Sequence, residues 1–378
     1  MLSQSLTHAT QAPAVARPAR RSRGLSCRAQ AATGTVAPPR PKNELLVGLV
    51  EALFKFPPFF SFAAKNARAM IVKRGEKMGM DFQAEIDALR SVDWDEELEA
   101  ARDPTVAYPS YYTQPFHAYP EGNLAMEPAL EMTVAARSVH SVVYDPDGKT
   151  LDPQASGAGR QVCVFALERM SDEVQPRFRL VFHGRPGVRE QGARPVKDIL
   201  DVGAATGLSS LALLQAFPGA QVTGIDLSPH MIAVGRYLQR QRNAERAAAG
   251  QQPEQLRFVH GAGEDTRLPD GCMDLVSIML VCHELPAAAS QAIFKEAFRV
   301  LRPSGALAVM EMNPASPIFQ RIFSNPFPYV AFKSTEPWLL EYLSLDMPGA
   351  MTAAGFLSPR QLENSPRHKT VVAVKPQQ

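Results

Sequence analysis

Short apolar runs alternate with longer amphipathic segments from residue 196 to the end of the chain. Strands are predicted at Val196–Val202, Gln221–Leu227, Arg257–Gly261, Met273–Val281, Leu307–Met312 and Thr370–Val374. Helices are predicted at Leu208–Phe217, Pro229–Ala249, Ala287–Leu301, Trp338–Leu345 and Ala350–Ala354. Strands that alternate with helices in this order predict an α/β domain over 196–378 with a doubly wound, parallel sheet.

The preceding region, from about residue 43 to 195, has a less regular pattern and predicts a mainly helical accessory region, or substrate lid. Helices are expected at 43–56, 59–74, 81–89, 95–102 and 124–140. Segment 104–123 is rich in Pro and Tyr and predicts irregular structure, and the runs 161–168 and 177–183 suggest a hairpin.

Charge divides the chain unevenly. The 378 residues carry a net charge of +2, but residues 1–43 hold six Arg, one Lys and no acid, which leaves −5 on the remainder. Nucleic-acid binding needs a dense cationic face, so we expect no nucleic-acid partner.

Residues 1–42 are acid-free and rich in Arg, Ala and Ser, a composition typical of an organelle transit peptide. We expect a disordered plastid-targeting segment and a chloroplast location, in the stroma or peripheral to the thylakoid or envelope membrane. A plain disordered tail is the alternative.

The four cysteines, Cys27, Cys163, Cys272 and Cys282, have neither metal-ligand nor disulfide-framework spacing, so we predict no metal site. Residues 45–74 contain five Phe followed by Lys and Arg, and such a helix can contact an anionic membrane surface. The alternative is that this helix packs on the domain with its cations in water.

The sharpest motif lies where the first strand of the domain meets its helix, at Asp198–Ser209. A dinucleotide fold would place glycine at 203, 205 and 208, whereas this chain has Gly203, Ala205 and Leu208. Asp201 stands two residues before the first glycine, where it would repel a pyrophosphate but suit an ammonium or sulfonium ligand. The motif therefore disfavours a nicotinamide-dependent oxidoreductase.

Further carboxylates follow at the ends of the next two strands. Asp226 ends the second strand, where a carboxylate can accept both hydroxyls of a ribose. Glu264 and Asp265 follow the third strand, where an acidic side chain can accept from an adenine amine.

This ordered set resembles the motifs of class I S-adenosylmethionine-dependent methyltransferases, most closely the UbiE-like, methyltransferase type 11 branch. The segment Ala297–Leu307 resembles the final motif of that branch, and Ala205 departs from it where glycine is common. The segment with Phe116, His117, Tyr119 and Gly122 resembles a plant, algal and cyanobacterial group of plastid-targeted type. The resemblance implies a seven-stranded Rossmann-like sheet and S-adenosylmethionine as cofactor.

Carried over by position, the resemblance also implies cofactor contacts. Asp201, Gly203 and Thr206 would line the methionine part, with Gly207 in the same loop. Asp226 would hold the ribose and Leu227 would lie against the adenine. Gly263, with Glu264 or Asp265, would contact the adenine amine, and Met279 or Val281 would form the pocket floor.

Residues for the methyl acceptor are less sharply marked. His283 follows the fourth strand and is the candidate general base, although it could simply cap the next helix. Tyr111, Tyr112, Phe116, His117 and Tyr119 could wall a substrate pocket or form a packed loop. We expect a methyltransferase acting on a small molecule, with a lipophilic quinone- or pigment-like acceptor in the plastid fitting an aromatic pocket. The alternatives are a plastid protein methyltransferase and a non-catalytic cofactor-binding assembly protein.

Overall fold

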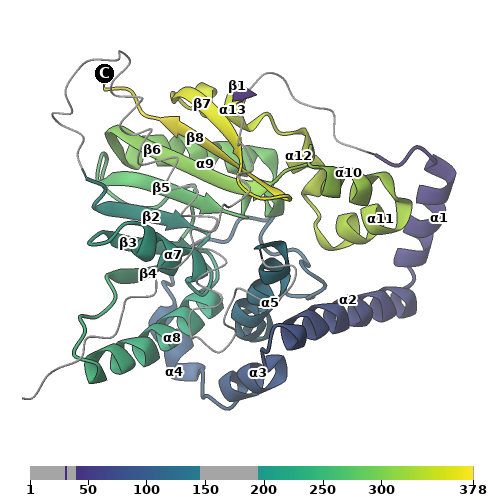
Figure 1. Ribbon diagram of the computed structural model, residues 1–378, viewed down its shortest axis with the longest axis horizontal. Helices are drawn as coiled ribbons and strands as arrows, with labels where there is room; N and C mark the ends of the chain where they lie inside the picture. The colour runs from purple at the N-terminus through teal and green to yellow at the C-terminus, as the bar shows by residue number, and fades with distance from the viewer. Residues whose placement is uncertain (1–29, 32–39, 145–194, 378) are drawn as a thin grey trace, which may run out of the picture.

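The computed structural model describes residues 30–31, 40–144 and 195–377 (Figure 1). The predicted hairpin at 161–183 lies outside these residues, as does the predicted transit peptide apart from residues 30–31 and 40–42. The described part is an α/β fold in which one sheet is flanked by helices, as predicted.

The sheet is built from seven main strands in the order β7-β8-β6-β5-β2-β3-β4. Neighbours from β4 to β6 pair in parallel, whereas β8 runs antiparallel between β6 and β7. The strands are β2 (Asp198–Val202), β3 (Gln221–Asp226), β4 (Leu256–His260), β5 (Met273–Met279), β6 (Leu301–Met312), β7 (Leu357–Glu363) and β8 (His368–Val374).

A two-residue strand, β1 (Gln30–Ala31), pairs antiparallel with β7 at the edge of the sheet. These residues fall inside the segment 1–42 that was expected to be disordered, so that expectation is wrong for this pair. This pairing gives two residues on the outer edge of β7 a backbone partner.

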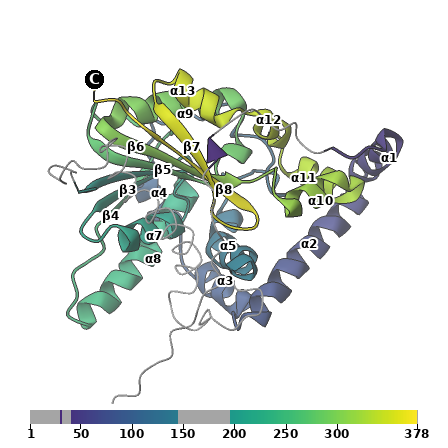
Figure 2. The same cartoon turned by 45° about the horizontal axis from the view of Figure 1, so that its top comes forward.

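Helices cover both faces of the sheet, which makes it doubly wound (Figures 1 and 2). The helices α7 (Leu208–Ala216) and α8 (Pro229–Ala248) lie on one face, and α9 (Ala287–Val300) and α13 (Met347–Ala353) on the other. Successive strand residues point to opposite faces, so Ile199 joins the core on the α7 side and Leu200 the core on the α9 side.

The N-terminal helices pack onto this domain. The helix α4 (Asp95–Ala101) packs on α8, and α2 (Pro57–Lys77) packs on α5 (Met126–Tyr144), with α3 (Phe82–Arg90) beside it. The helix α1 (Glu44–Phe54) instead packs on α11 (Pro326–Thr335) at the far end of the molecule. These helices match the predicted positions within a few residues.

Besides β1, two helices and one strand are additions to the predicted pattern. The helices α10 (Pro317–Ser324) and α11 precede α12 (Leu339–Ser344), which was predicted. Ser316 and Asn325 cap α10 and α11 by accepting from backbone amides, and each helix starts with Pro. The strand β7 carries Pro359 and polar residues, so its sequence lacks a clear strand pattern.

Candidate active site

The carboxyl ends of the parallel strands meet at one edge of the sheet, and most of the predicted site residues lie there. Asp201 is in register with Gly224 on β3 and with Ser277 on β5. Asp226 ends β3 in register with His260. Ligands of open α/β sheets bind at this edge, so the sheet places the two carboxylates where a cofactor would lie.

Asp226 connects three segments. Its Oδ2 accepts from the Ala205 amide at 2.9 Å, and its Oδ1 accepts from the Ser228 amide at 2.8 Å. The Tyr112 hydroxyl lies 3.5 Å from Oδ1. Burial raises the pKa of Asp226 while the two amides oppose that rise. The carboxylate therefore orders the loop after β2 and the start of α8, and it also faces the aromatic segment.

Asp201 is fully buried and only half satisfied. Its Oδ2 accepts from the hydroxyls of Ser209 at 2.6 Å and Ser210 at 2.7 Å. Its Oδ1 is buried and has no hydrogen-bond partner among the described residues. Burial raises the pKa of Asp201 to about 6, against the lowering effect of Ser209, Ser210 and the nearby Ser277 hydroxyl. A buried carboxylate oxygen without a partner favours a ligand that brings a cationic donor.

The loop between β2 and α7 gives its amides to the protein. The amides of Gly203 and Ala204 donate to the Ile225 carbonyl at 2.8 and 3.1 Å, and the Ala205 amide donates to Asp226. A pyrophosphate cradle needs such amides free. The structure therefore agrees with the sequence in disfavouring a dinucleotide site.

Two predicted cofactor residues in this loop have packing partners. A Cβ on Gly207 (φ 94°) would lie 2.5 Å from the Phe258 ring, so this glycine allows α7 to approach β4 closely. The Thr206 hydroxyl is 2.9 Å from the Thr133 hydroxyl of α5 and is buried. These two residues hold the loop between the strands and α5.

In the loop after β4, the two acidic residues predicted to contact the adenine have different surroundings. The Glu264 carboxylate accepts from the Tyr111 hydroxyl, whereas Asp265 is exposed. Gly263 is buried, and a Cβ there would lie 2.6 Å from Val202 Cγ1. Of the two predicted adenine ligands, Glu264 therefore lies with the aromatic segment.

Leu227, predicted to lie against an adenine, directly follows β3 and is buried. His260 Nε2 lies 3.1 Å from the Leu227 carbonyl, and His260 Nδ1 accepts from the Asp103 amide at 2.9 Å. The second bond assigns the ring proton to Nε2, which then donates to Leu227. His260 thus ties the N-terminal region to the predicted adenine side.

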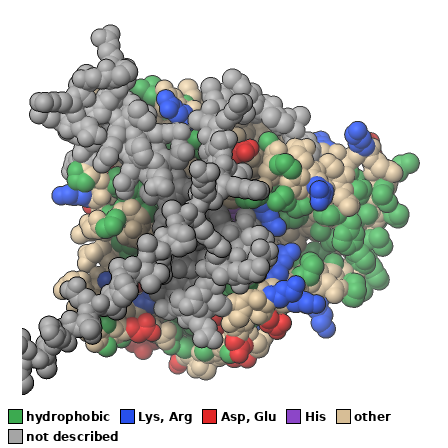
Figure 3. All heavy atoms as spheres, viewed as in Figure 1, with side chains coloured by type: hydrophobic (Ala, Val, Ile, Leu, Met, Phe, Trp, Pro, Cys, Tyr) green, Lys and Arg blue, Asp and Glu red, His purple; other side chains and the backbone are tan. Residues whose placement is uncertain are grey.

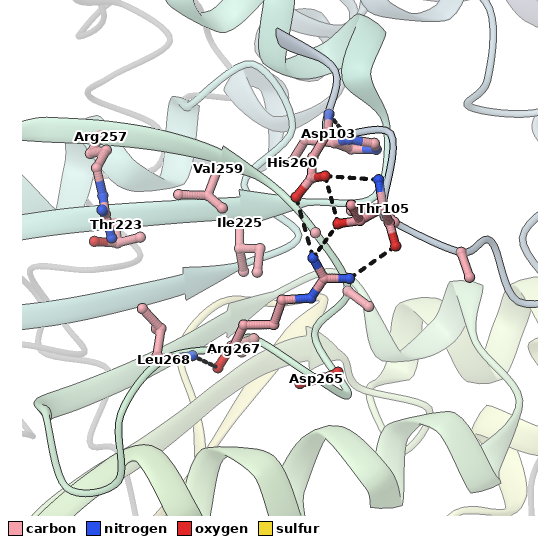
Figure 4. Close-up of a pocket in the computed structure, with 15 residues that line it drawn as sticks. Asp103, Thr105, Thr223, Ile225, Arg257, Val259, His260, Asp265, Arg267 and Leu268 are labelled. Atoms are coloured by element: carbon pink, nitrogen blue, oxygen red, sulfur yellow. Dashed lines mark hydrogen bonds and ion pairs between the residues drawn. The ribbon is translucent and has the colours of Figure 1, made fainter.

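A pocket of about 360 Å³ lies beside this histidine, on the face of β3 and β4 (Figure 4). Arg267 closes one side, because its guanidinium pairs with Asp103 at 3.3 Å and donates to the Thr105 carbonyl at 3.0 Å. Asp265 also lines this pocket. Segment 103–107 is therefore fixed to the loop after β4.

The aromatic segment 108–123 is irregular, as predicted, and its candidate residues have different partners. Tyr111 and Tyr112 contact the carboxylates of Glu264 and Asp226. Phe116 is buried, and the Tyr119 hydroxyl donates to Glu131 of α5 at 3.0 Å. Tyr111 and Tyr112 therefore reach the cofactor edge, while Tyr119 attaches the segment to α5.

His117 belongs to a second cluster. Its Nε2 pairs with Glu336 at 2.7 Å, and its amide donates to the Thr335 carbonyl at 3.1 Å. Burial lowers and Glu336 raises the pKa of His117, with a net rise. This contact ties the aromatic segment to the end of α11.

His283 follows β5 and forms a pair that the sequence did not reveal. Its Nδ1 lies 3.0 Å from Oε2 of Glu311, a fully buried residue on β6, and its amide donates to Glu311 Oε1 at 3.2 Å. Burial lowers the pKa of His283, but the charge and hydrogen bond of Glu311 raise it to about 10. A lone Glu in the apolar run Leu307–Met312 was the available signal for this partner.

Glu284 lies beside these histidines. Its pKa is raised to about 7 by burial and by the charges of Glu336 and Glu311, although His117 and His283 act in the opposite direction. Carboxylates and imidazoles from four segments therefore face one another at the ends of β5 and β6.

The two residues predicted to form the pocket floor, Met279 and Val281, lie at and just after the end of β5. Met279 ends β5 and is half-buried, and a Cβ on Gly203 would collide with the Val281 side chain. Leu280, between them, has a φ of 57°, which is unusual for a residue with a branched side chain. Val281 therefore lies directly against the first loop glycine.

Comparison with known proteins assigns the sheet region. Residues 199–305 match the family model described as a methyltransferase domain. A demethylmenaquinone methyltransferase from Staphylococcus aureus is 30% identical over 145 residues, which cover 38% of this chain and 55% of that protein. The chain thus spans about half the length of the curated relatives it matches.

Solved structures are more distant. The apo form of the methyltransferase SibL is 19% identical with a TM-score of 0.43, covering 84% of this chain and 77% of that one. An arsenic(III) methyltransferase from Chlamydomonas reinhardtii is 21% identical with a TM-score of 0.36, covering 48% and 64%.

The strand order and the carboxylates at the strand ends agree with the family match. Residues 199–305 therefore match a methyltransferase domain, and the comparisons support S-adenosylmethionine as its cofactor. The residues present fit that cofactor, because Oδ1 of Asp201, which has no hydrogen-bond partner among the described residues, suits its ammonium group and Asp226 suits its ribose.

Proposed function

We propose that the chain is a plastid S-adenosylmethionine-dependent methyltransferase whose acceptor is a small lipophilic molecule of the quinone or pigment type. The observation that carries the proposal is Asp201, a buried carboxylate whose Oδ1 has no hydrogen-bond partner among the described residues, at the end of a strand adjacent to that of Asp226. The name of the Staphylococcus aureus relative supports a quinone-like acceptor. The composition of residues 1–42 supports the plastid location.

The residues that would hold the cofactor are Asp201 for the ammonium group, Asp226 for the ribose, and Leu227 with Glu264 for the adenine. The bound cofactor supplies an electrophilic methyl group. Because such a transfer requires in-line approach, positioning of the acceptor is the main task of this protein. Tyr111 and Tyr112 are the aromatic residues nearest to the cofactor carboxylates and would cover them.

His283 would position the acceptor. The pairing with Glu311 keeps the imidazole protonated at neutral pH, since the pKa of His283 is raised to about 10. A protonated ring is a donor at Nε2, which has no hydrogen bond among the described residues, and it stabilises an acceptor oxygen that carries negative charge. We therefore assign His283 to binding an ionised acceptor oxygen, in place of the general base that its sequence position suggested.

Two other functions are compatible with a cofactor site alone: methylation of a plastid protein, and a non-catalytic assembly role. The aromatic segment favours the small molecule, because Tyr111 and Tyr112 supply aromatic surface next to the carboxylates of the cofactor edge. Transfer of labelled methyl groups into protein instead of lipid would support the first, and cofactor binding with no transfer would support the second.

Calorimetry on the full chain tests the cofactor assignment. We expect S-adenosylmethionine to bind with a dissociation constant in the micromolar range, about −8 kcal/mol, and NADH to show no heat of binding. Asp226→Ala should abolish cofactor binding, with circular dichroism as the check that this variant folds. Tight NADH binding together with no response to S-adenosylmethionine would contradict the proposal.

A further inference from the structure

Exposed apolar side chains gather at one end of the molecule. Among the described residues, ten large hydrophobic side chains are exposed, and eight of them lie on or beside α1, α2 and α11: Leu45, Leu46, Leu49, Leu53, Phe56, Phe62, Met70 and Phe327. Figure 3 shows this gathering at the right-hand side, with Lys and Arg among and beside it. Contiguous exposed apolar surface of this kind marks an interaction site.

The helix α1 is apolar on two faces, and the domain covers one of them. Val50 and Phe54 are buried in the core against α11, and Glu51 pairs with Lys333 of that helix at 2.7 Å. Leu45, Leu49 and Leu53 recur every four residues, so they lie along the other face, and Leu45 and Leu49 are 89% and 60% exposed. A helix with a second, exposed apolar face needs a second apolar contact.

The outer face of α2 mixes apolar and cationic side chains. At 100° per residue, Phe62, Lys65, Ala69, Lys73 and Lys77 fall on one stripe, with Met70 at its margin, and Asn66 and Glu76 lie on the same stripe; all eight are exposed. Long Lys side chains can lay their methylene groups along an apolar layer while the ammonium stays in water. This arrangement suits an interface between hydrocarbon and anionic headgroups.

Charge separates this end of the molecule from the rest. Residues 44–80 hold six Lys or Arg and three Glu, a net charge of +3. Since residues 1–43 carry +7, residues 81–378 carry −8. A surface with negative charge would attract the α1–α2 end and repel the body.

We propose that this surface, the α1–α2 face, docks on an anionic lipid bilayer; it comprises Leu45, Leu49, Leu53, Phe56, Phe62 and Met70 with Lys55, Lys65, Lys73 and Lys77. In the described part of the chain no single helix meets the length and hydropathy expected of a membrane span. The pair α1 and α2 meets them together, but with a bend of 93°. Docking places both helices in the headgroup layer, with the leucines inserted and the lysines on phosphates.

The α1–α2 face is joined to the candidate active site by direct contacts. Arg68 of α2 donates from Nε to Glu131 at 3.2 Å, and the same carboxylate holds Tyr119 of the aromatic segment. On the other side, α11 leads from α1 to Glu336, the partner of His117. These contacts tie the aromatic segment to the helices that dock on the lipid, in which a lipophilic acceptor would be dissolved.

Vesicle co-sedimentation of the full chain tests the docking without any turnover. We expect binding to phosphatidylcholine vesicles that contain phosphatidylglycerol to be at least about tenfold tighter than to phosphatidylcholine alone. Raising the salt from about 0.05 to about 0.5 M should weaken it. Because no methyl transfer is measured, failure here leaves the proposed function untouched.

Matched variants locate the surface. Leu49→Glu should weaken vesicle binding about tenfold or more, whereas Leu357→Glu, at a side chain 55% exposed on β7, should not. Lys73→Glu should weaken it about fivefold, and Lys295→Glu on α9, which makes the same charge change, should not. Equal effects at the control positions, or no vesicle binding at all, would overturn the proposal. So would a dimer of the lipid-free chain that Leu49→Glu dissociates while vesicle binding persists.

Discussion

The Tyr112 hydroxyl lies 3.5 Å from Oδ1 of Asp226, joining residues 114 positions apart in the sequence. Tyr112 belongs to the irregular segment before α5, and Asp226 ends β3 in the sheet. The N-terminal region therefore forms part of the cofactor edge. A ribose hydroxyl and the Tyr112 hydroxyl would use the same carboxylate oxygen.

Removing that hydroxyl should favour the cofactor. We expect Tyr112→Phe to tighten S-adenosylmethionine binding about two- to fivefold, because a long hydrogen bond contributes about 0.5–1 kcal/mol. Tyr119→Phe is the matched control, since that hydroxyl donates to Glu131 instead, and its affinity should stay unchanged. Weaker binding by Tyr112→Phe in calorimetry would show that the hydroxyl itself holds the cofactor.

Cofactor affinity should depend on pH through Asp201. Without cofactor, burial raises the pKa of the Asp201 carboxyl to about 6. Below that pH the carboxyl must therefore lose its proton before the ammonium group can bind. Affinity should therefore be constant from pH 7 to 8 and fall about tenfold per pH unit below 6.

Asp201→Asn should bind more weakly and lose this pH dependence. Asp265→Asn, at an exposed carboxylate, should keep the wild-type pH dependence. Calorimetric titrations from pH 5 to pH 8 measure both, and the same slope in Asp201→Asn as in the wild type would show that another group is responsible.

The pH profile of turnover should distinguish the two roles of His283. A protonated donor with a pKa raised to about 10 predicts a constant kcat from pH 7 to 9, whereas a base would give a kcat that rises through this range. His283→Gln should lower kcat about a hundredfold or more with little change in cofactor affinity.

The variant Glu311→Gln distinguishes a positioning role of the His283–Glu311 pair from a purely structural one, because it should change the pH profile of kcat. Without the buried carboxylate the pKa of His283 should fall, so kcat should decline as the pH rises through the neutral range. His230→Gln on α8 is the control and should keep the flat profile. If the pH profile of kcat stayed flat in Glu311→Gln, the His283–Glu311 pair would not position the acceptor.

Ala205 carries a backbone cost. Its φ of 46° is a left-handed conformation that alanine adopts with strain of about 1 kcal/mol. Ala205→Gly should relieve this strain, partly offset by the greater chain entropy of unfolded glycine, and raise the free energy of unfolding by up to about 1 kcal/mol. Urea unfolding checks this, and Ala204→Gly, at a buried position outside the left-handed region, should instead destabilise the fold.

The sequence predicts those helices and strands whose local hydrophobic pattern matches their burial in the folded protein. The strands β2 and β5 have apolar runs because both of their faces are covered, and α8 starts at Pro229 after the Ser228 cap. The strand β7 was missed because it packs near the sheet edge with exposed residues such as Leu357. The helix α10 has a clear amphipathic period and a Ser316 cap, so its sequence did carry a helical signal, whereas α11 has a weaker period and packs on α1.

The site residues that lie at the end of a single strand could be predicted from the sequence. Asp201 and Asp226 follow from the strand pattern, because parallel strands place their ends together. The pairing of His283 with Glu311 and of His117 with Glu336 arises between segments distant in sequence, which spacing cannot reveal. Likewise, Thr206 and Gly207 match the motif, but their packing against Thr133 and Phe258 depends on the tertiary fold.

The most direct measurement of the central claim is transfer of labelled methyl from S-adenosylmethionine by the full chain into fractionated plastid extract. We predict that label enters the lipid-soluble fraction, that the protein and nucleic-acid fractions stay unlabelled, and that Asp226→Ala abolishes the signal. Label confined to the protein fraction would contradict the acceptor, and an absence of label from every fraction by a chain that binds the cofactor would contradict methyl transfer.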